Sequence, residues 1–424
     1  MEGCIISPLL APAISLLAAL CLSGVAHAQN FQIDVASPNA RALQSAIDKC
    51  PRGYGSRTKG CQIRLPSGTI RGAWKIGGKG SAALQVGVCL VGQGAGHGST
   101  TPGGKPGAAG TTLVYEGPPG GVLLDFAGGD FPCLKNLSLA MHGAAVGVRF
   151  RAEPGTPIQN PILEHVSIAG DKTRPGGIGI QITDSQENGQ VDALLAEGLK
   201  INFVDVGIEV NSHQAVTNRI GPGSKITGQR SAVRLLKGSL SLDGVLAQCR
   251  TANCCTYDLD LHHGYFRVRD GYHEIGLDPA RNAALLCLPH RNGEGVGSAH
   301  MVSLSESYVN VQCNSSLAPC AVDLVRGRSN TVVVLRDNWI YSAGGPGNRA
   351  RRRARVSLDG ATRPARLVWS GNGSIPLLAA LGPKVAVEAF RSDGATSWND
   401  LDLDGVPDPN EPRMTSAREA GAPQ

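Results

Sequence analysis

A short run of aromatic and basic residues holds the side chains best suited to chemistry on an acidic sugar. Tyr265, Arg267 and Arg269 recur at every second position, and His273 follows four residues later. Alternate side chains of a β-strand share one face, so we expect the first three to lie together. Arginine holds a uronate carboxylate with paired hydrogen bonds, while tyrosine or histidine moves a proton. The spacing therefore predicts Tyr265, Arg267, Arg269 and His273 as candidate catalytic residues for β-elimination.

The same spacing is also typical of an ordinary strand that has no catalytic role. Phe266 and Val268 alternate with the two arginines, as in any strand with one buried and one solvated face. Hydrolysis is less favoured, because it requires two positioned carboxyl groups and the chain contains no Asp-Asp dipeptide. A solvated strand face therefore remains an open alternative to an active site.

Acidic residues alternate with other residues near the C-terminal end of the chain, in the stretch 400–411. The candidate metal ligands are Asp400, Asp402, Asp404, Asp408 and Glu411. Carboxylates at this spacing, with Gly405 at the sixth position, provide the oxygen ligands that Ca²⁺ prefers. The stretch resembles the Asp-rich calcium loops of thrombospondin type 3 repeats. We expect a structural Ca²⁺ here, and the alternative is an acidic tail without a ligand.

The elements that must position these residues are short. The chain has 56 Gly and 26 Pro among 424 residues, and aromatic residues make up only 4%. This composition favours a turn-rich β protein whose core is aliphatic. Residues 37–50 are the exception: Ser37 is a candidate N-cap, Pro38 suits the first turn, and Leu43, Ala46 and Ile47 share one helical face.

Two strand patterns alternate along the chain. A small residue followed by alternating apolar residues recurs about every 24–32 residues, as in 147–150, 179–182 and 207–210. A second pattern, seen at 134–139, 163–168 and 335–340, runs out of phase with the first. Stacked coils would pair every strand with the coils above and below it, so the patterns predict a solenoid of about ten coils. A β-sandwich is the structural alternative.

The first 80 residues of this region resemble a known family. The stretches 42–48, 63–70, 89–94 and 111–115 are similar to the opening of the pectate-lyase superfamily. The resemblance extends over residues 37–345 and implies an all-β fold, a single-stranded right-handed parallel β-helix with an N-terminal capping helix at 37–50. It also implies action on a carbohydrate, without fixing the reaction.

The N-terminus and the cysteines indicate export. Residues 1–28 form an apolar segment that ends in Ala-His-Ala, which predicts a signal peptide; an uncleaved membrane anchor is the alternative. Ten cysteines follow, an even number typical of disulfides in a secreted protein. Cys50 with Cys61, and Cys313 with Cys320, are close enough to close loops. Two further bridges are expected among Cys249, Cys254, Cys255 and Cys287.

These observations divide the chain into five segments. They are a signal peptide (1–28), a β-helix (29–345), a basic loop with terminal β segments (346–398), the calcium-type loop (399–411) and a disordered tail (412–424). The net charge of +6 is too diffuse to indicate nucleic acid, and no segment of the mature chain is long and apolar enough to span a membrane.

The protein is expected to be secreted or held at the cell surface, and its expected partner is an extracellular polysaccharide or glycan, with an acidic polysaccharide preferred. β-Elimination is preferred over hydrolysis. A non-catalytic adhesive protein and a bare structural repeat protein are the alternatives.

Overall fold

The computed structural model describes residues 31–51, 60–77, 87–95, 110–184, 189–251, 253–260, 264–275, 283–289, 301–311, 320–329, 331–341, 352–360, 365–372 and 377–390. The predicted signal peptide, Cys313, the calcium-type loop and the C-terminal tail lie outside these residues.

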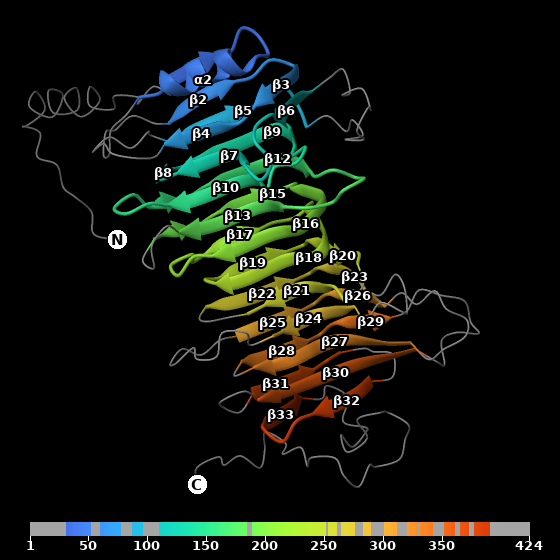
Figure 1. Ribbon diagram of the computed structural model, residues 1–424. Coiled ribbons are helices and arrows are strands. Elements are labelled where there is room, and N and C mark those ends of the chain that lie inside the picture. The colour runs from blue at the N-terminus through green and yellow to red at the C-terminus, as the bar shows by residue number, and fades with distance from the viewer. Residues whose placement is uncertain are drawn as a thin grey trace, which may run out of the picture.

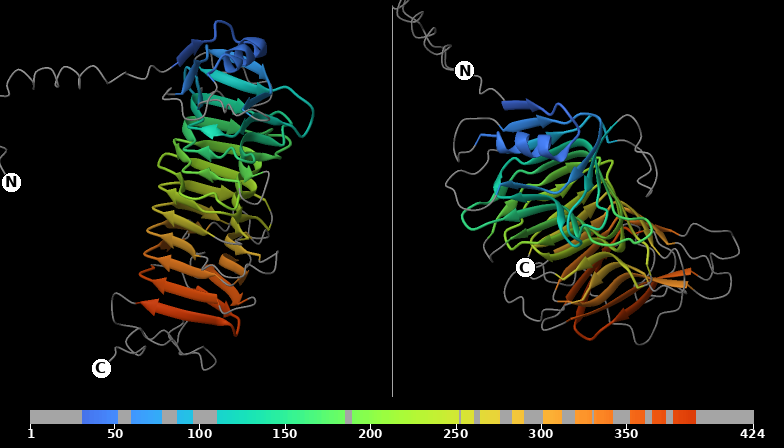
Figure 2. Two further views of the ribbon diagram at one scale, coloured as in Figure 1. Left: turned by 90° about the vertical axis from the view of Figure 1, so that its left-hand side faces the viewer. Right: turned by 45° about the horizontal axis from the view of Figure 1, so that its top comes forward.

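The described chain winds into a stack of coils whose strands pair in parallel, as Figures 1 and 2 show. Each coil contributes strands to three columns. The first column consists of β1 (Phe31–Asp34), β2 (Cys61–Arg64), β5 (Val88–Val91), the start of β9 (Cys133–Ala140) and of β12 (Ile162–Ala169), β15 (Leu195–Glu197), β17 (Asn218–Ile220), β19 (Leu240–Asp243), β22 (Tyr265–Arg269), β25 (Met301–Ser305), β28 (Val332–Arg336), β31 (Ala365–Ser370) and β33 (Val385–Phe390).

The other two columns repeat the same parallel pairing. The second column consists of β3 (Gly68–Gly72), β6 (Thr111–Tyr115), the ends of β9 and β12, the start of β16 (Lys200–Asn211) and of β18 (Lys225–Lys237), β20 (Leu246–Cys249), β23 (Tyr272–Ile275), β26 (Tyr308–Val311) and β29 (Trp339–Tyr341). The third consists of β4 (Trp74–Gly77), β7 (Val122–Ala127), β10 (Val146–Ala152), β13 (Ile178–Asp184), the ends of β16 and β18, β21 (Cys255–Leu259), β24 (Ala284–Leu288), β27 (Cys320–Ser329), β30 (Arg352–Gly360) and β32 (Leu377–Leu381).

The predicted all-β, parallel β-helix is therefore confirmed. A small sheet of β8 (Gly129–Asp130), β11 (Ile158–Gln159) and β14 (Val191–Asp192) lies beside the columns. Parallel pairing continues to Phe390, so the stack extends beyond the boundary predicted at residue 345.

Aliphatic side chains stacked coil upon coil form the core. One inward row of the second column runs Ile70, Leu113, Leu139, Ile168, Ile201, Ile226, Ala247, His273, Val309 and Ile340. Each member is buried by its neighbours in the coils above and below, at about 25 cal/mol per Å² of apolar surface. A core built this way requires few aromatic residues, which accounts for the composition.

Helix α2 (Ala40–Asp48) lies at the N-terminal end of the stack (Figure 1). Its buried face is Leu43, Ala46 and Ile47, as the spacing predicted. The N-cap is Asn39, whose side chain accepts from the backbone N–H of Ala42 (2.8 Å), so the prediction of Ser37 as the cap was wrong. Both residues are good caps, and the helix starts two residues later than expected.

The first and second columns meet at a sharp corner in every coil. Asp270, Glu306 and Asp337 occupy this corner with φ of 52°, 53° and 54°. Asn338, next to the corner, is buried and donates from Nδ2 to the carbonyl oxygen of Leu304 (3.0 Å), and its Oδ1 accepts from the N–H of Ser307 (3.1 Å). These bonds tie successive corners together, so the strands on each side keep a fixed register.

Four disulfides lie within the described residues: Cys50–Cys61, Cys89–Cys133, Cys249–Cys254 and Cys255–Cys287. The Cys50–Cys61 bridge and the two bridges among the four central cysteines are as predicted. Disulfides are typical of proteins that fold in an oxidising compartment. Within the described ranges, no helix has the length and apolarity needed to cross a membrane.

Candidate functional site

The outer face of the first column carries three of the four residues predicted as catalytic. On β22, Phe266 and Val268 are buried, while Arg267 and Arg269 are exposed and Tyr265 is half-buried. Tyr265, Arg267 and Arg269 thus share the outer face as the alternation predicted. Nε of Arg269 pairs with Oε2 of Glu306 (3.1 Å), and within the described part of the chain Arg267 has no ion pair.

His273 is not brought together with these three residues. It lies on β23, beyond the corner, and its side chain is fully buried in the inward row of the second column. Burial lowers its pKa to about 3, and its Nδ1 lies 3.2 Å from the hydroxyl of Tyr257. The corner between β22 and β23 changes which positions point inward, so closeness in the sequence did not bring His273 to the face of Arg269. No proton shuttle from His273 to the β22 face follows from this geometry.

An aromatic row on the second column was missed by the sequence analysis. Tyr272, Tyr308 and Trp339 are register partners on β23, β26 and β29, strands that follow one another down the right-hand side of Figure 1. Parallel strands lie about 4.8 Å apart, so the row advances by that distance per coil. Tyr308 is 53% exposed and Trp339 is 60% exposed, which is unusual for side chains of this size.

A polar row runs beside the aromatic row on the same outer face. Its members, in successive coils, are Gln248, Glu274, Asn310 and Tyr341. Asn310 Nδ2 donates to the hydroxyl of Tyr272 (3.3 Å), and the hydroxyl of Tyr341 donates to the same oxygen (3.3 Å). That hydrogen bond is the main reason why the pKa of Tyr341 is raised to about 12, so its phenol stays protonated.

Glu274 is the one acidic side chain of the polar row. With its amide nitrogen facing Glu274, Gln248 donates to Oε2 of Glu274 (2.8 Å) and accepts from Oγ1 of Thr227 (3.0 Å) and from Nη2 of Arg250 (3.1 Å). No ion pair joins Glu274 to a cation among the described residues. The outer face of β23, β26 and β29 thus combines exposed rings with one carboxylate held by a neutral amide.

A sequence signal for the aromatic row exists. The triplets 272–274, 308–310 and 339–341 each place an aromatic residue before an inward residue and then a polar side chain. Their inward members are His273, Val309 and Ile340. Because the triplets are 36 and 31 residues apart, they become neighbours only once the length of each coil is known.

The outer face of the third column is filled by matched charges. Asp125, Arg149, Gln181, Glu209, Arg234 and Asp258 follow one another in register. Arg149 binds Asp125 through Nε (2.9 Å) and Nη2 (2.7 Å), and Nε of Arg234 donates to Glu209 (2.7 Å). Asp125 with Arg149, and Glu209 with Arg234, satisfy one another, which indicates a structural role.

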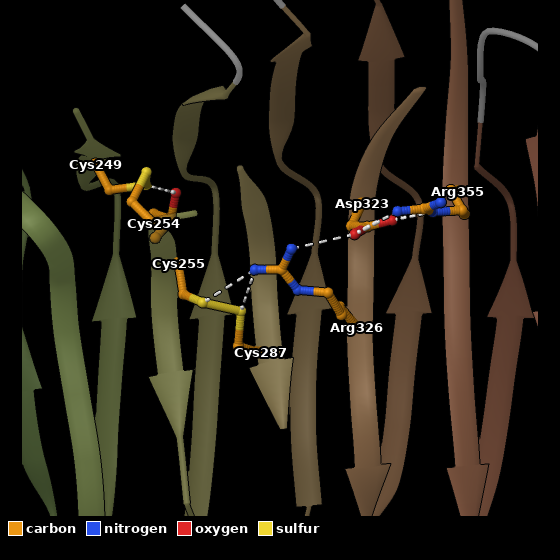
Figure 3. Close-up of a disulfide and its surroundings, with 8 residues drawn as sticks. Cys249, Cys254, Cys255, Cys287, Asp323, Arg326 and Arg355 are labelled. Carbon is orange, nitrogen blue, oxygen red and sulfur yellow. Dashed lines mark hydrogen bonds and ion pairs between the residues drawn. A yellow bond between two sulfur atoms is a disulfide. The ribbon is translucent and has the colours of Figure 1, made fainter. Parts of the chain in front are cut away.

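The same register leads to a disulfide held between charged residues. Arg326 Nη2 lies 3.7 Å from Sγ of Cys255 and 3.6 Å from Sγ of Cys287, and its Nη1 lies 3.6 Å from Asp323 (Figure 3). Arg355 also binds Asp323, with Nη2 at 2.9 Å from Oδ2. The Asp323 side chain is 1% exposed, so it is not presented to a ligand. Its charge is balanced within the protein by Arg326 and Arg355.

Neither an enclosed pocket nor a metal centre stands out in the described ranges. A cavity of about 220 Å³ lies between the 153–157 turn and residues 189 and 190, and Glu153 at its edge pairs with Arg151 (2.9 Å). That volume is below the range usual for small-molecule sites. No group of His, Cys, Asp and Glu side chains suited to a metal ion occurs among the described residues, and the predicted calcium ligands lie outside them.

Comparisons with known proteins found similarity to solved structures. One is PfbA, a surface adhesin of Streptococcus pneumoniae, at 12% identity and a TM-score of 0.46, covering 86% of this chain and 93% of the adhesin. Another is DFA-IIIase from Arthrobacter chlorophenolicus A6, at 12% identity and a TM-score of 0.44, covering 85% and 94%. A third is an alginate lyase from a Paenibacillus species, at 14% identity and a TM-score of 0.34, covering 84% and 99%.

No family model matches the sequence, and no curated protein matches it. The chain is therefore assigned by its own strand pairing, as a disulfide-bonded parallel β-helix.

Proposed function

We propose that this protein binds an extracellular polysaccharide along the aromatic row of Tyr272, Tyr308 and Trp339. The observation that carries the proposal is the exposure of Tyr308 and Trp339 on adjacent strands. A folded protein exposes neighbouring large rings at a cost, and such surfaces commonly serve a partner. Aromatic faces are electron-rich and attract the C–H groups of a sugar ring.

The geometry suits a polymer better than a single small molecule. The row runs along the axis of the stack and advances by about 4.8 Å per coil, close to the length of one sugar ring. Each coil therefore offers a ring to one sugar unit. The cavity described above is small and lies on a different part of the molecule, so the open outer face is the better candidate surface.

Polysaccharide binding without turnover fits this surface. Tyr341 keeps its proton because its pKa is raised to about 12, and His273 is buried. The outer face of β23, β26 and β29 therefore holds hydrogen-bond donors and acceptors, and Glu274 is the one acidic side chain among its outward positions. The adhesive alternative considered from the sequence is thus preferred over the lyase.

Affinity electrophoresis of the mature protein against a panel of polysaccharides tests the proposal. We expect retardation by at least one polymer, and loss of that retardation in Trp339→Ala. Phe131→Ala is the matched control, because Phe131 is 57% exposed but lies on another part of the stack. If no polymer retards the wild type, or if Trp339→Ala is retarded as strongly as the wild type, the proposal is wrong.

β-Elimination of a uronate polymer is a second candidate function, located on the outer face of β22. It is favoured by one observation: Tyr265, Arg267 and Arg269 share that face, and within the described residues Arg267 has no ion pair. Incubation with uronate polymers, with and without Ca²⁺, would produce unsaturated ends that absorb ultraviolet light. Absence of that absorbance with every polymer removes the lyase candidate and leaves the binding proposal intact.

A further inference from the structure

The charges around the aromatic row specify which polysaccharides it accepts. On the three strands β23, β26 and β29, the outward positions are Tyr272, Glu274, Tyr308, Asn310, Trp339 and Tyr341. Four of these side chains are aromatic, one is an amide and one is a carboxylate. A uronate polymer carries a negative charge on each sugar, and no outward position on these strands offers a cation to balance it.

A second carboxylate adds to this charge at the corner. Asp270 lies two residues before Tyr272, is exposed, and forms no ion pair with any described residue. The corner residues of the next two coils differ, because Glu306 pairs with Arg269 (3.1 Å) and Asp337 pairs with Arg336 (2.9 Å). Glu274 and Asp270 are therefore carboxylates near the row that have no ion pair among the described residues, and the Arg250 guanidinium is separated from Glu274 by the Gln248 amide, to which it donates (3.1 Å).

The first column shows the opposite distribution. The outward positions of β22, β25 and β28 include Arg267, Arg269 and Arg336 and no carboxylate; Arg269 and Arg336 pair with corner carboxylates, and Arg267 has no ion pair among the described residues. A polyanion approaching the molecule would be attracted to that face and repelled from the aromatic row. The two outer faces therefore differ in how they receive a polyanion.

We propose that the aromatic row binds an uncharged polysaccharide of six-membered sugar rings, and that Glu274 is a specificity-determining residue. This inference rests on the proposed function. Tyr308 and Trp339 stack on the apolar faces of successive sugars, while the Glu274 carboxylate accepts hydrogen bonds from sugar hydroxyls. A polycation is a poorer match, because a polymer with one charge per sugar would find a single carboxylate among the outward side chains of three coils.

The test uses matched pairs of ligands that differ only in oxidation at C6. The wild type is titrated calorimetrically with β-1,4-mannan and β-1,4-mannuronan oligosaccharides, and with the corresponding glucan and glucuronan pair. We expect each uncharged oligosaccharide that binds to bind at least about tenfold more tightly than its uronate partner. A deacetylated amino-sugar oligomer and its acetylated form make a third pair, in which the uncharged member is again expected to bind more tightly.

The Glu274→Gln variant separates charge from shape. It keeps the size of the side chain, so we expect weaker binding of the uncharged oligosaccharide by about threefold to tenfold, and tighter binding of the uronate. Glu197→Gln is the matched control: Glu197 is an exposed carboxylate without an ion pair among the described residues, on β15 of the first column, and its replacement should change neither affinity.

Failure of the inference differs from failure of the proposed function. Tighter binding of the uronate or of the cationic oligomer, still lost in Trp339→Ala, would overturn the inference and keep the aromatic row as a binding surface. Equal affinities in wild type and Glu274→Gln for both members of a pair would also overturn it. Absence of binding to every oligosaccharide and polymer would overturn the proposed function, and the inference with it.

Discussion

The outer faces of the second and third columns are built on the same backbone but carry opposite kinds of side chain. On the third column, charged residues in register bind one another, as Arg149 does with Asp125. On the second column, Tyr308 and Trp339 stand exposed in adjacent coils. Stacked coils bring equivalent positions close together on every face. A face whose residues satisfy one another stabilises the fold, whereas a face that leaves large rings exposed is available for a ligand.

Removing the exposed rings of Tyr308 and Trp339 is expected to have the largest effect on polysaccharide binding. In the double variant Tyr308→Ala/Trp339→Ala, each truncation is expected to cost about 1.4 kcal/mol of binding free energy, or roughly 100-fold in affinity together. The midpoint of thermal unfolding should change little, because both side chains are exposed. Titration calorimetry and thermal unfolding measure the two effects. A large drop in the unfolding midpoint with unchanged affinity would assign these rings to the fold.

The reciprocal variant alters the third column. Arg149→Met leaves the Asp125 carboxylate without its main partner in a position that is 7% exposed. Burial raises the pKa of Asp125, but the hydrogen bond and charge of Arg149, with help from Arg151, hold it below its usual value. We expect a loss of about 1–3 kcal/mol in the free energy of unfolding, measured in urea, with unchanged polysaccharide affinity. An Arg149→Met protein as stable as the wild type would show that the charged row contributes no net stability.

The buried His273 of the second column is expected to make the free energy of unfolding depend on pH. Its pKa is about 3 in the folded protein against an ordinary value of 6.5, so between these two pH values the unfolded chain binds more protons. The free energy of unfolding should therefore fall as the pH is lowered from about 6.5 towards 3. In Tyr257→Phe/His273→Val, which removes the histidine and its hydroxyl partner together, this part of the pH dependence should be lost. An unchanged slope would place the titration on other groups.

Loss of Ca²⁺ binding is expected to have the smallest effect on polysaccharide affinity. The sequence places its ligands at 400–411, after the last described strand β33. We expect the wild type to bind Ca²⁺ in titration calorimetry and Asp402→Asn/Asp404→Asn to lose that binding, with unchanged polysaccharide affinity. Equal Ca²⁺ binding by both proteins would remove the loop as the metal site.

The sequence predicts the fold better than the site. Alternation of apolar residues is a local property, so the strands, the helix around Leu43 and Ile47, and the outward positions of Arg267 and Arg269 could be read directly. The inward position of His273 depends on the corner at Asp270, which resets the alternation. The aromatic row depends on coil lengths, because Tyr272, Tyr308 and Trp339 are neighbours only in the stack.

A crystal structure of the protein with a bound oligosaccharide would show whether polysaccharide lies on the aromatic row. The oligosaccharide is the one bound most tightly in the calorimetric panel. We expect sugar rings stacked on Trp339 and Tyr308, with hydroxyl groups hydrogen-bonded to the carboxylate of Glu274. Sugar bound instead on the outer face of β22, or along the charged row of the third column, would contradict it.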